Sequence, residues 1–334
     1  MAEKTLLDVN PSGLIEHDHN HDGIDRRGFL KCMAWAGSGA LCVIHGGVLT
    51  SKALGLPGSA KAHARGELSF VQISDSHMGF NKPANPDVIS TLKAAVDKIN
   101  ALSEPPAFIL HTGDISHLSK PEEFDNVDQI LKSTNKEIFF VPGEHDVLND
   151  DGAMFRERYG KNSKGRGWYS FAQNGVHFIG LVNVMNLKAG GLGTLGSDQL
   201  EWLRDDVSHL KASTPIVVFA HIPLWTIYPQ WGWGTEDSGQ ALSYLKRFGS
   251  VTVLNGHIHQ TMQKVEGNVT FHTAFSTAFP QPAPGAADSP GPMKVPADQL
   301  RSVLGITDVN YVQRRHALAL VDSSLASSTS RSMS

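Results

Sequence analysis

The amino-acid sequence predicts an α/β fold, because short apolar runs alternate with amphipathic helical patterns from residue 68 onward. The apolar runs are rich in β-branched side chains and nearly uninterrupted, which is typical of strands buried on both faces of a sheet. No internal repeat is evident along the 334 residues. A single domain over residues 65–323 is therefore the simplest expectation, followed by a Ser-rich tail over residues 324–334.

Each element is predicted from its own pattern. Apolar side chains recur at three- and four-residue spacing over residues 88–99 and 200–210, so helices are expected there. Two long segments lack such a pattern, namely the aromatic-rich residues 223–233 and the proline-rich residues 279–296, and both are expected to be functional or mobile loops. The predicted strands are Leu68–Ile73, Ala107–Leu110, Ile138–Val141, Val176–Val184, Ile216–Phe219 and Val251–Leu254.

The charges of the chain nearly balance. It carries 29 Lys and Arg against 33 Asp and Glu, a formal net charge of −4, and 40% of its residues are hydrophobic. This composition lacks the basic excess of a nucleic-acid-binding protein and the low hydrophobicity of a disordered one. We therefore expect a globular protein without a nucleic-acid partner.

The first 64 residues differ from the rest and are interpreted as a signal peptide. A polar, His-rich segment over residues 16–22 precedes Arg26 and Arg27, and an apolar run rich in Gly and Ala follows over residues 32–49. The paired arginines, followed by Gly-Phe-Leu-Lys, resemble the bacterial twin-arginine signal, and residues 62–64 (Ala-His-Ala) offer a small-residue cleavage site. We expect the twin-arginine translocase to export the chain to the periplasm or the medium.

Two alternatives concern this leader. The apolar run could remain as a membrane anchor, but it is short for a bilayer and is interrupted by His45, so we expect no permanent anchor. The His-rich segment could hold a metal, or it could be a solvated leader that is discarded with the signal. Cys32 and Cys42 both lie in the leader, so the mature chain would have no thiol or disulfide chemistry.

Histidines and carboxylates follow five of the predicted strands at their carboxyl ends. Because α/β sheets place their functional sites at this edge, we expect these side chains to converge. Burying so many polar groups without a metal would be prohibitively costly, so a metal site is predicted. The groups are Asp75 and His77, Asp114, Glu144 to Asp146, His221, and His257 and His259.

The spacing and chemistry of these groups favour a pair of metal ions. Asp75-x-His77 and His257-x-His259 each place two ligands on the same side of an extended segment. Imidazole and carboxylate ligands suit Mn, Fe, Zn or Ni better than Mg or Ca. One bridging aspartate would hold two ions about 3.5–4 Å apart, the separation used in two-metal hydrolysis. Glycines expected to let the backbone turn sharply beside the ions are Gly113, Gly143 and Gly256.

Five blocks, Asp-x-His, Gly-Asp, Gly-Glu-His-Asp, a lone His and Gly-His-x-His, follow one another over residues 73–259. In this order they resemble the motifs of the calcineurin-like metallophosphoesterase family. The resemblance implies an α/β/β/α sandwich of two mixed β-sheets flanked by helices. It also implies a dinuclear enzyme in which a metal-bound hydroxide attacks phosphate mono- or diesters, with two divalent ions or Fe(III) and a divalent ion. The implied ligands are Asp75, His77, Asp114 and His259 for the first ion, and Asp114, Glu144, His221 and His257 for the second.

The same resemblance assigns further roles around the phosphate. It implies that His145 contacts the phosphate and helps the leaving group depart, and that Asp146 orients His145. His117 is expected either to touch the catalytic histidine beside the substrate or to be a surface turn residue. Trp225, in the loop that begins just after His221, is expected to wall an apolar or planar substrate group, with ordinary loop packing as the alternative.

Glu144 departs from the family pattern, which has an Asn at this position. A longer anion replaces a neutral ligand and lowers the net charge of the site from about +2 to about +1. Glu144 could bind the second ion, act as a base beside it, or compete with the substrate phosphate. In the last case the chain would be a catalytically silent metal- or phosphate-binding protein, which is the alternative function.

Two further comparisons within the sequence narrow the class of protein. The cyclic-nucleotide phosphodiesterase and purple acid phosphatase branches fit best, although no Tyr follows Asp114 where a purple enzyme has one, and the protein Ser/Thr phosphatase motif is absent after Gly113. A dinucleotide-binding interpretation of Gly191, Gly193 and Gly196 is weak, because no acidic ribose ligand follows.

Overall fold

The structure, a computed structural model, describes residues 40–45, 48–53, 67–312 and 318–326. The predicted twin-arginine motif and cleavage site lie outside these residues. The described part of the predicted leader forms an antiparallel hairpin of strands β1 (Ala40–His45) and β2 (Val48–Ala53).

Two mixed β-sheets form the body of the domain. One has the strand order β13-β12-β3-β4-β5, with β3, β4 and β5 parallel and β12 antiparallel to both of its neighbours. The other has the order β10-β11-β9-β8-β7-β6, with β7, β8, β9 and β11 parallel and the two edge strands antiparallel. The strands are β3 (Glu67–Ile73), β4 (Phe108–His111), β5 (Glu137–Phe140), β6 (Tyr169–Gln173), β7 (Val176–Gly180), β8 (Ile216–Phe219), β9 (Val251–Asn255), β10 (Gln263–Glu266), β11 (Val269–Thr273), β12 (Gly305–Val312) and β13 (Leu318–Ser324).

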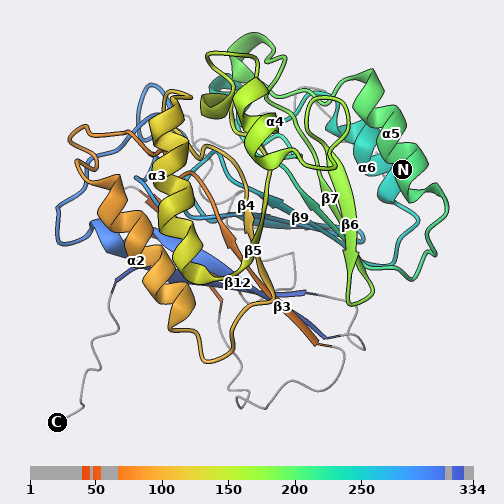
Figure 1. The fold of residues 1–334 in the computed structure, drawn as a ribbon, viewed down its shortest axis with the longest axis horizontal. Helices are drawn as coiled ribbons and strands as arrows, with labels where there is room; N and C mark the ends of the chain where they lie inside the picture. Colours follow the sequence, from red (N-terminus) through yellow and green to blue (C-terminus); the bar gives the residue numbers. More distant parts are fainter. Residues whose placement is uncertain (1–39, 46–47, 54–66, 313–317, 327–334) are drawn as a thin grey trace, which may run out of the picture.

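The sheets pack face to face and helices cover their outer faces, with α2 and α3 on one side and α5 and α6 on the other (Figure 1). In β3, Phe70 packs in the core between the sheets, whereas Val71 packs against the outer helices. Val217 and Val218 of β8 alternate in the same way, which explains the uninterrupted apolar runs and confirms the sandwich. The helices are α2 (Val88–Asn100), α3 (Pro121–Leu131), α4 (Ala153–Tyr159), α5 (Ser197–Ser208) and α6 (Ser238–Leu245).

The carboxyl ends of the parallel strands in both sheets meet at one edge. The amide of Gln72, near the end of β3, donates to the carbonyl of Asn255 at the end of β9 over 3.1 Å and so connects the two sheets. Within the first sheet, the backbone N–H of Asp75 donates to the carbonyl of Gly113 over 2.9 Å. The loops that carry the predicted ligands are therefore held together by their own backbones.

One predicted strand is too long. The apolar run Val176–Val184 is a strand only as far as Gly180. Beyond it, the side chain of Gln199 on α5 accepts from the N–H of Val182 over 2.8 Å and donates to its carbonyl over 2.6 Å, replacing a neighbouring strand. The chain leaves the sheet here although its side chains stay buried.

The carboxyl-terminal end is more ordered than the sequence indicates. Strand β13 runs to Ser324 and Leu325 is buried, so the folded chain continues past the predicted boundary at residue 323. None of the helices in the described part of the chain combines the length and apolarity needed to cross a bilayer.

The candidate metal centre

The loops after β3, β4 and β9 carry ligands on a strained backbone. Asp75, His77, Asp114, His257 and His259 all have positive φ, between 39° and 70°. Residues other than Gly rarely adopt a positive φ, because it strains the backbone. Such strained residues cluster at functional sites, where the surrounding structure enforces the conformation. Here it directs the side chains toward one point instead of alternating them across a strand.

Three of the predicted ligands form a first cluster. His77 Nε2 lies 3.1 Å from His259 Nε2, and His259 Nε2 lies 3.3 Å from the Oδ1 atom of Asp75. All three side chains are buried. Asp114 Oδ2 lies 3.4 Å from His77 Nε2 and therefore borders this cluster.

A second cluster lies on the other side of Asp114. The carboxylate of Glu144 lies between two imidazoles, with 2.9 Å from Oε2 to His221 Nε2 and 2.9 Å from Oε1 to His257 Nδ1. Asp114 Oδ2 is 3.4 Å from His221 Nε2, the same separation as from His77. Asp114 is thus shared by the two clusters, in the position of a bridging ligand.

The donor set fits metal ions. Carbonyl oxygens of Thr112 and Phe279 accept hydrogen bonds from Nδ1 of His221 and His259, which leaves the lone pair of each Nε2 directed into the site. Buried ring nitrogens of His221 and His257 and the Oε2 atom of Glu144 have no hydrogen-bond partner among the described residues, although they approach one another closely. Converging lone pairs that bond to nothing in the protein are the arrangement that a cation satisfies.

The charges of His77 and Glu144 agree with this assignment. Burial and the neighbouring histidines hold the pKa of His77 well below its usual range, which keeps its imidazole neutral. Burial would raise the pKa of Glu144, but His257 and His221 hold it well below its usual range, so the carboxylate stays ionised. Neutral imidazole and ionised carboxylate are the forms that bind metals. At His221 burial would lower the pKa, but Asp114 and Glu144 raise it well above its usual value, so a metal there would have to displace a proton.

Gly113 has a φ of +96°, as the predicted sharp turn requires, whereas Gly143 and Gly256 serve a different purpose from the predicted one. A Cβ on Gly143 would lie 2.0 Å from Oδ1 of Asp114, and a Cβ on Gly256 would lie 2.6 Å from Oδ2 of Asp75. Neither glycine has a positive φ. They are needed because the backbone passes too close to a ligand carboxylate for any side chain, and not because the chain turns sharply there.

His145 and His117 lie together beside the clusters. Their rings stack with 4.9 Å between centroids, and Nδ1 of His145 donates to the backbone carbonyl of His117 over 2.7 Å. Burial would lower the pKa of His145, but the carboxylates of Asp114 and Glu144 raise it above its usual value. Burial, the charge of His145 and that of Lys82 contribute to lowering the pKa of His117 to about 4.

Asp146 does not orient His145, contrary to the prediction. Its carboxylate accepts from the backbone N–H groups of Gly143, Ile115 and Ser116 and from the Ser116 hydroxyl, over 2.8 to 3.1 Å. Asp146 therefore joins the loops after β4 and β5, and the carbonyl of His117 orients the imidazole of His145. The family resemblance placed Asp146 beside the site but did not predict its hydrogen-bond partners.

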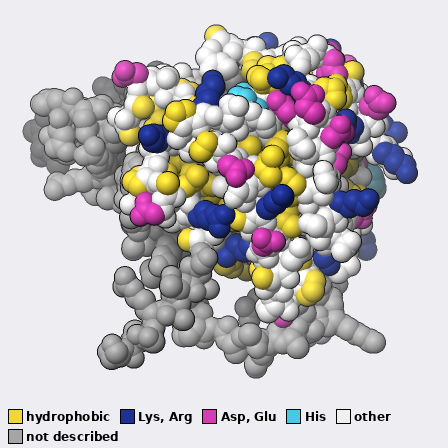
Figure 2. Space-filling view, turned by 60° about the vertical axis from the view of Figure 1, so that its left-hand side comes forward, with side chains coloured by type: hydrophobic (Ala, Val, Ile, Leu, Met, Phe, Trp, Pro, Cys, Tyr) yellow, Lys and Arg dark blue, Asp and Glu magenta, His cyan; other side chains and the backbone are white. Residues whose placement is uncertain are grey.

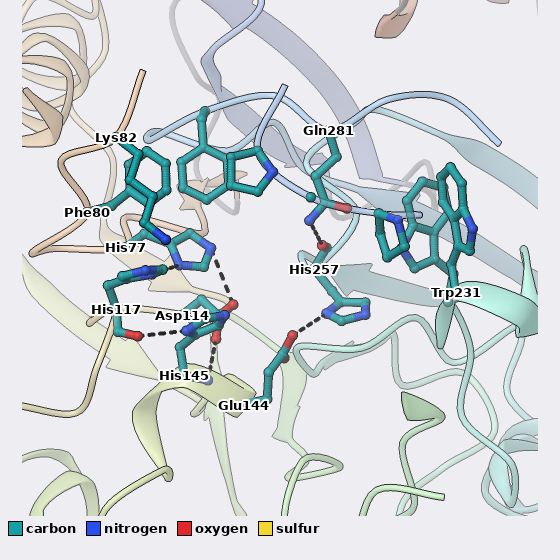
Figure 3. Close-up of a pocket in the computed structure, with 15 residues that line it drawn as sticks. His77, Phe80, Lys82, Asp114, His117, Glu144, His145, Trp231, His257 and Gln281 are labelled. Atoms are coloured by element: carbon teal, nitrogen blue, oxygen red, sulfur yellow. Dashed lines mark hydrogen bonds and ion pairs between the residues drawn. The ribbon is translucent and has the colours of Figure 1, made fainter. Parts of the chain in front are cut away.

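A cavity of about 280 Å³ opens above the clusters (Figure 3). Its lining includes His117 and His145 but not Trp225, which packs against Phe271 at 5.1 Å between ring centroids. Trp231 from the same loop takes the predicted place, because the loop turns back through a bridge between Tyr228 and Trp233. Lining residues that the sequence analysis did not single out are Phe80, Lys82, Trp231, Trp233, Phe279, Gln281, Pro290, Gly291 and Pro292.

Known proteins resemble this chain in sequence and in fold. The family model of calcineurin-like phosphoesterases matches residues 68–261. A 3′,5′-cyclic-nucleotide phosphodiesterase of Nostoc sp. is 26% identical over 225 residues, covering 64% of this chain and 79% of the relative. The serine/threonine-protein phosphatase CPPED1 of Mus musculus is 28% identical over 181 residues, covering 48% of this chain and 58% of the relative, although the protein Ser/Thr phosphatase motif is absent after Gly113.

Solved structures share the architecture at low identity. A dimetal phosphatase from Danio rerio superposes with a TM-score of 0.59 at 14% identity, covering 78% of this chain and 96% of that one. A purple acid phosphatase from yellow lupin seeds gives 0.53 at 11% identity, covering 83% and 54%. The family model, the named relatives and the fold together support a metal-dependent phosphoester hydrolase. The chain belongs to the calcineurin-like phosphoesterase family.

Proposed function

We propose that the chain is a dinuclear-metal enzyme that hydrolyses phosphate mono- or diesters. The observation that carries the proposal is the pair of ligand clusters on either side of Asp114, whose Oδ2 atom lies 3.4 Å from a histidine of each. Two ions held there, one by Asp75, His77, Asp114 and His259 and one by Asp114, Glu144, His221 and His257, would activate a water and offset the charge of the phosphate.

The protein side chains would divide the remaining work. Asp114 fixes the two half-sites relative to each other, and its Oδ1 atom accepts from the backbone N–H of His145 over 2.9 Å. His145 lines the cavity with Nδ1 bonded to the carbonyl of His117, so Nε2 is the atom free to give a proton to the departing oxygen. One P–O bond to the leaving alcohol breaks as the bond to the water oxygen forms.

Turnover by the metal-loaded protein tests this function. Protein supplied with Mn²⁺, Zn²⁺ or Fe²⁺ is assayed with bis(4-nitrophenyl) phosphate, 4-nitrophenyl phosphate and 3′,5′-cyclic AMP, the last suggested by the name of the Nostoc relative. We expect turnover of at least one ester, and a loss of about 100-fold or more in His221→Ala. His209→Ala, which changes an exposed histidine on the helix side of the second sheet, is the matched control and should retain activity.

The alternative is a catalytically silent metal- or phosphate-binding protein. The observation that favours it is Glu144, an anion within 2.9 Å of two ligand histidines, where it could compete with phosphate. Two ions bound per chain with no turnover of any ester would support this alternative and refute the enzymatic proposal.

We also propose that residues 1–64 direct export through the twin-arginine translocase to the periplasm or the medium. Support comes from the sequence alone, namely Arg26 and Arg27 ahead of an apolar run. Residues 1–64 fused to a reporter should be exported from a bacterium with this translocase, and changing Arg26 and Arg27 to lysine should abolish export. Unaltered export of the lysine variant would overturn the proposal.

A further inference from the structure

The cavity above the ligand clusters has two unlike walls. Lys82, His117 and His145 lie on one side of it, and Trp231 and Gln281 lie on the other, with Glu144 between them (Figure 3). Aromatic side chains, Phe80 and Trp231, lie on both walls, but Lys82 lies on one wall alone, so the two ends of a bound ester meet different charges.

The backbone around Lys82 is fixed to the site. The N–H of Phe80 donates to the carbonyl of the ligand His77 over 2.9 Å, and the N–H of Asn85 donates to the carbonyl of Lys82 over 3.0 Å. The side-chain amide of Asn85 then donates to the carbonyl of Ala278 over 2.6 Å, next to the cavity residue Phe279. Lys82 thus stands on a short loop that is anchored at both ends to the walls of the cavity.

The ammonium group of Lys82 has no carboxylate partner among the described residues. The ion pairs of the described chain involve other lysines and arginines, such as Lys264 with Glu266 and Arg166 with Asp151. The carboxylates of the cavity, Asp114 and Glu144, face the ligand histidines instead. Lys82 is also the sole Lys or Arg that lines the cavity in the described structure. An unpaired cation at the mouth of a cavity attracts an anionic group of a ligand.

The position of His145 decides which part of the substrate reaches Lys82. The proposed function, on which this step rests, has His145 protonate the departing oxygen, so the leaving alcohol lies on the wall that His145 shares with Lys82 (Figure 3). The retained part of the ester then lies toward Trp231. We propose that Lys82 is a specificity residue that binds an anionic group carried by the leaving alcohol of the substrate.

Two esters that differ by one carboxylate on the leaving group test this inference. Methyl 4-nitrophenyl phosphate releases a phenol without a further charge, and methyl 3-carboxy-4-nitrophenyl phosphate releases one that carries a carboxylate. In the metal-loaded wild type, the ratio of kcat/KM for the carboxylated ester over the neutral ester should fall as salt rises from about 20 to about 300 mM. Lys82→Met should lower this ratio about three- to tenfold, mainly through KM, and Lys82→Arg should largely preserve it.

Lys93→Met, on the exposed face of α2 and outside the cavity, is the matched control and should leave the ratio unchanged. An equal loss for both esters in Lys82→Met, or no change in the ratio, would overturn the assignment of Lys82. Failure of the proposed function looks different, because the metal-loaded wild type would then turn over neither of these diesters and none of the mono- and diesters in the turnover assay. Circular dichroism of Lys82→Met shows whether the variant is folded. Lys82→Arg keeps the positive charge and so tests whether the charge at this position, and not the lysine side chain itself, sets the ratio.

Discussion

At the residue scale, Glu144 replaces the Asn of the family and lies within 2.9 Å of both His221 and His257. This geometry favours the first of the three roles considered for it, that of a ligand. Asn in Glu144→Asn is shorter and neutral, and the surrounding histidines of this chain are spaced for the longer carboxylate, so we expect the second ion to be lost. Metal analysis should then give about one ion per chain in place of about two, and ester turnover should fall about tenfold or more.

The opposite result has a clear meaning. A gain of turnover in Glu144→Asn with two ions retained would show that the carboxylate competes with substrate. Asp150→Asn, which changes an acidic residue that bonds to the N–H of Met154 away from the ligands, controls for the loss of a negative charge.

His145 gives a second prediction at this scale. If it protonates the leaving oxygen, its removal matters most where the leaving group is a poor one. His145→Ala should lower kcat about 100-fold or more for an alkyl ester but much less for a 4-nitrophenyl ester, because nitrophenolate departs without help. The comparison requires steady-state rates on both esters and metal analysis showing that the ions remain. Equal losses on both esters would contradict a role as general acid.

The sequence located the ligands because each one directly follows an apolar strand, where position in the chain nearly determines position in the sheet. It misplaced contacts that depend on how a loop folds back. Trp225 and Trp231 belong to the same aromatic segment, and only the turn between Tyr228 and Trp233 decides which of them reaches the cavity. Three of the four hydrogen bonds of Asp146 were equally hidden, since their donors lie about 30 residues earlier in the chain.

At the scale of elements, a buried polar contact holds α5 on the second sheet. His177 on β7 and Ser170 on β6 both bond to the carboxylate of Asp206 on α5, over 2.7 and 2.6 Å. Burial would raise the pKa of Asp206, but these two hydrogen bonds lower it below its usual value. A carboxyl whose pKa is lowered on folding adds stability above its unfolded pKa, near 3.8, and that stability is lost as pH falls through the folded value.

Asp206→Asn should therefore lower the free energy of unfolding by about 1–3 kcal/mol at pH 7. The difference from the wild type should shrink below about pH 4, where the wild-type carboxyl also becomes protonated. Urea unfolding at several pH values measures both effects. Asp205→Asn, at the adjacent and more exposed position paired with Arg204, is the control and should change stability little. A difference that is constant with pH would contradict the role of the ionised carboxylate.

The strands that could be predicted from the sequence are those whose residues are uniformly apolar. Strands β4, β8 and β9 are buried along their whole length, so their side chains show an unbroken pattern. Strand β10 is mostly exposed, and β12 places Thr307, Asp308 and Asn310 between its apolar side chains. Such strands form because a neighbour supplies their hydrogen bonds, and that information is not local in the sequence.

At the scale of the whole molecule, the ligand set draws on both sheets. Asp75 and Asp114 follow strands of the first sheet, whereas His221 and His257 follow strands of the second. Ions that bind all four groups bind the folded chain and not the unfolded one, so they stabilise the packing of one sheet on the other.

Chelation should accordingly lower the Tm, and restoring Mn²⁺ at about 100 times its Kd should add about 2.7 kcal/mol, or about 5–10 °C in Tm. Differential scanning calorimetry with and without EDTA measures the shift. Asp114→Asn, which weakens the ligand shared by both clusters, should lose most of it, whereas His209→Ala should retain it. The same shift in Asp114→Asn as in the wild type would contradict a shared ligand.

The positive φ angles of Asp75, His77, Asp114, His257 and His259 carry a consequence for how this molecule can change. Each is a conformational penalty of order 1–3 kcal/mol, which the enclosing loops and the ions of the proposed centre would offset. Substituting glycine at any one of these five positions would remove the backbone strain but also remove a metal ligand. A gain in stability there would therefore come with a loss of activity. Substitutions intended to stabilise this protein should therefore be made in the helices of the outer layers and not at the carboxyl-terminal edge of the two sheets.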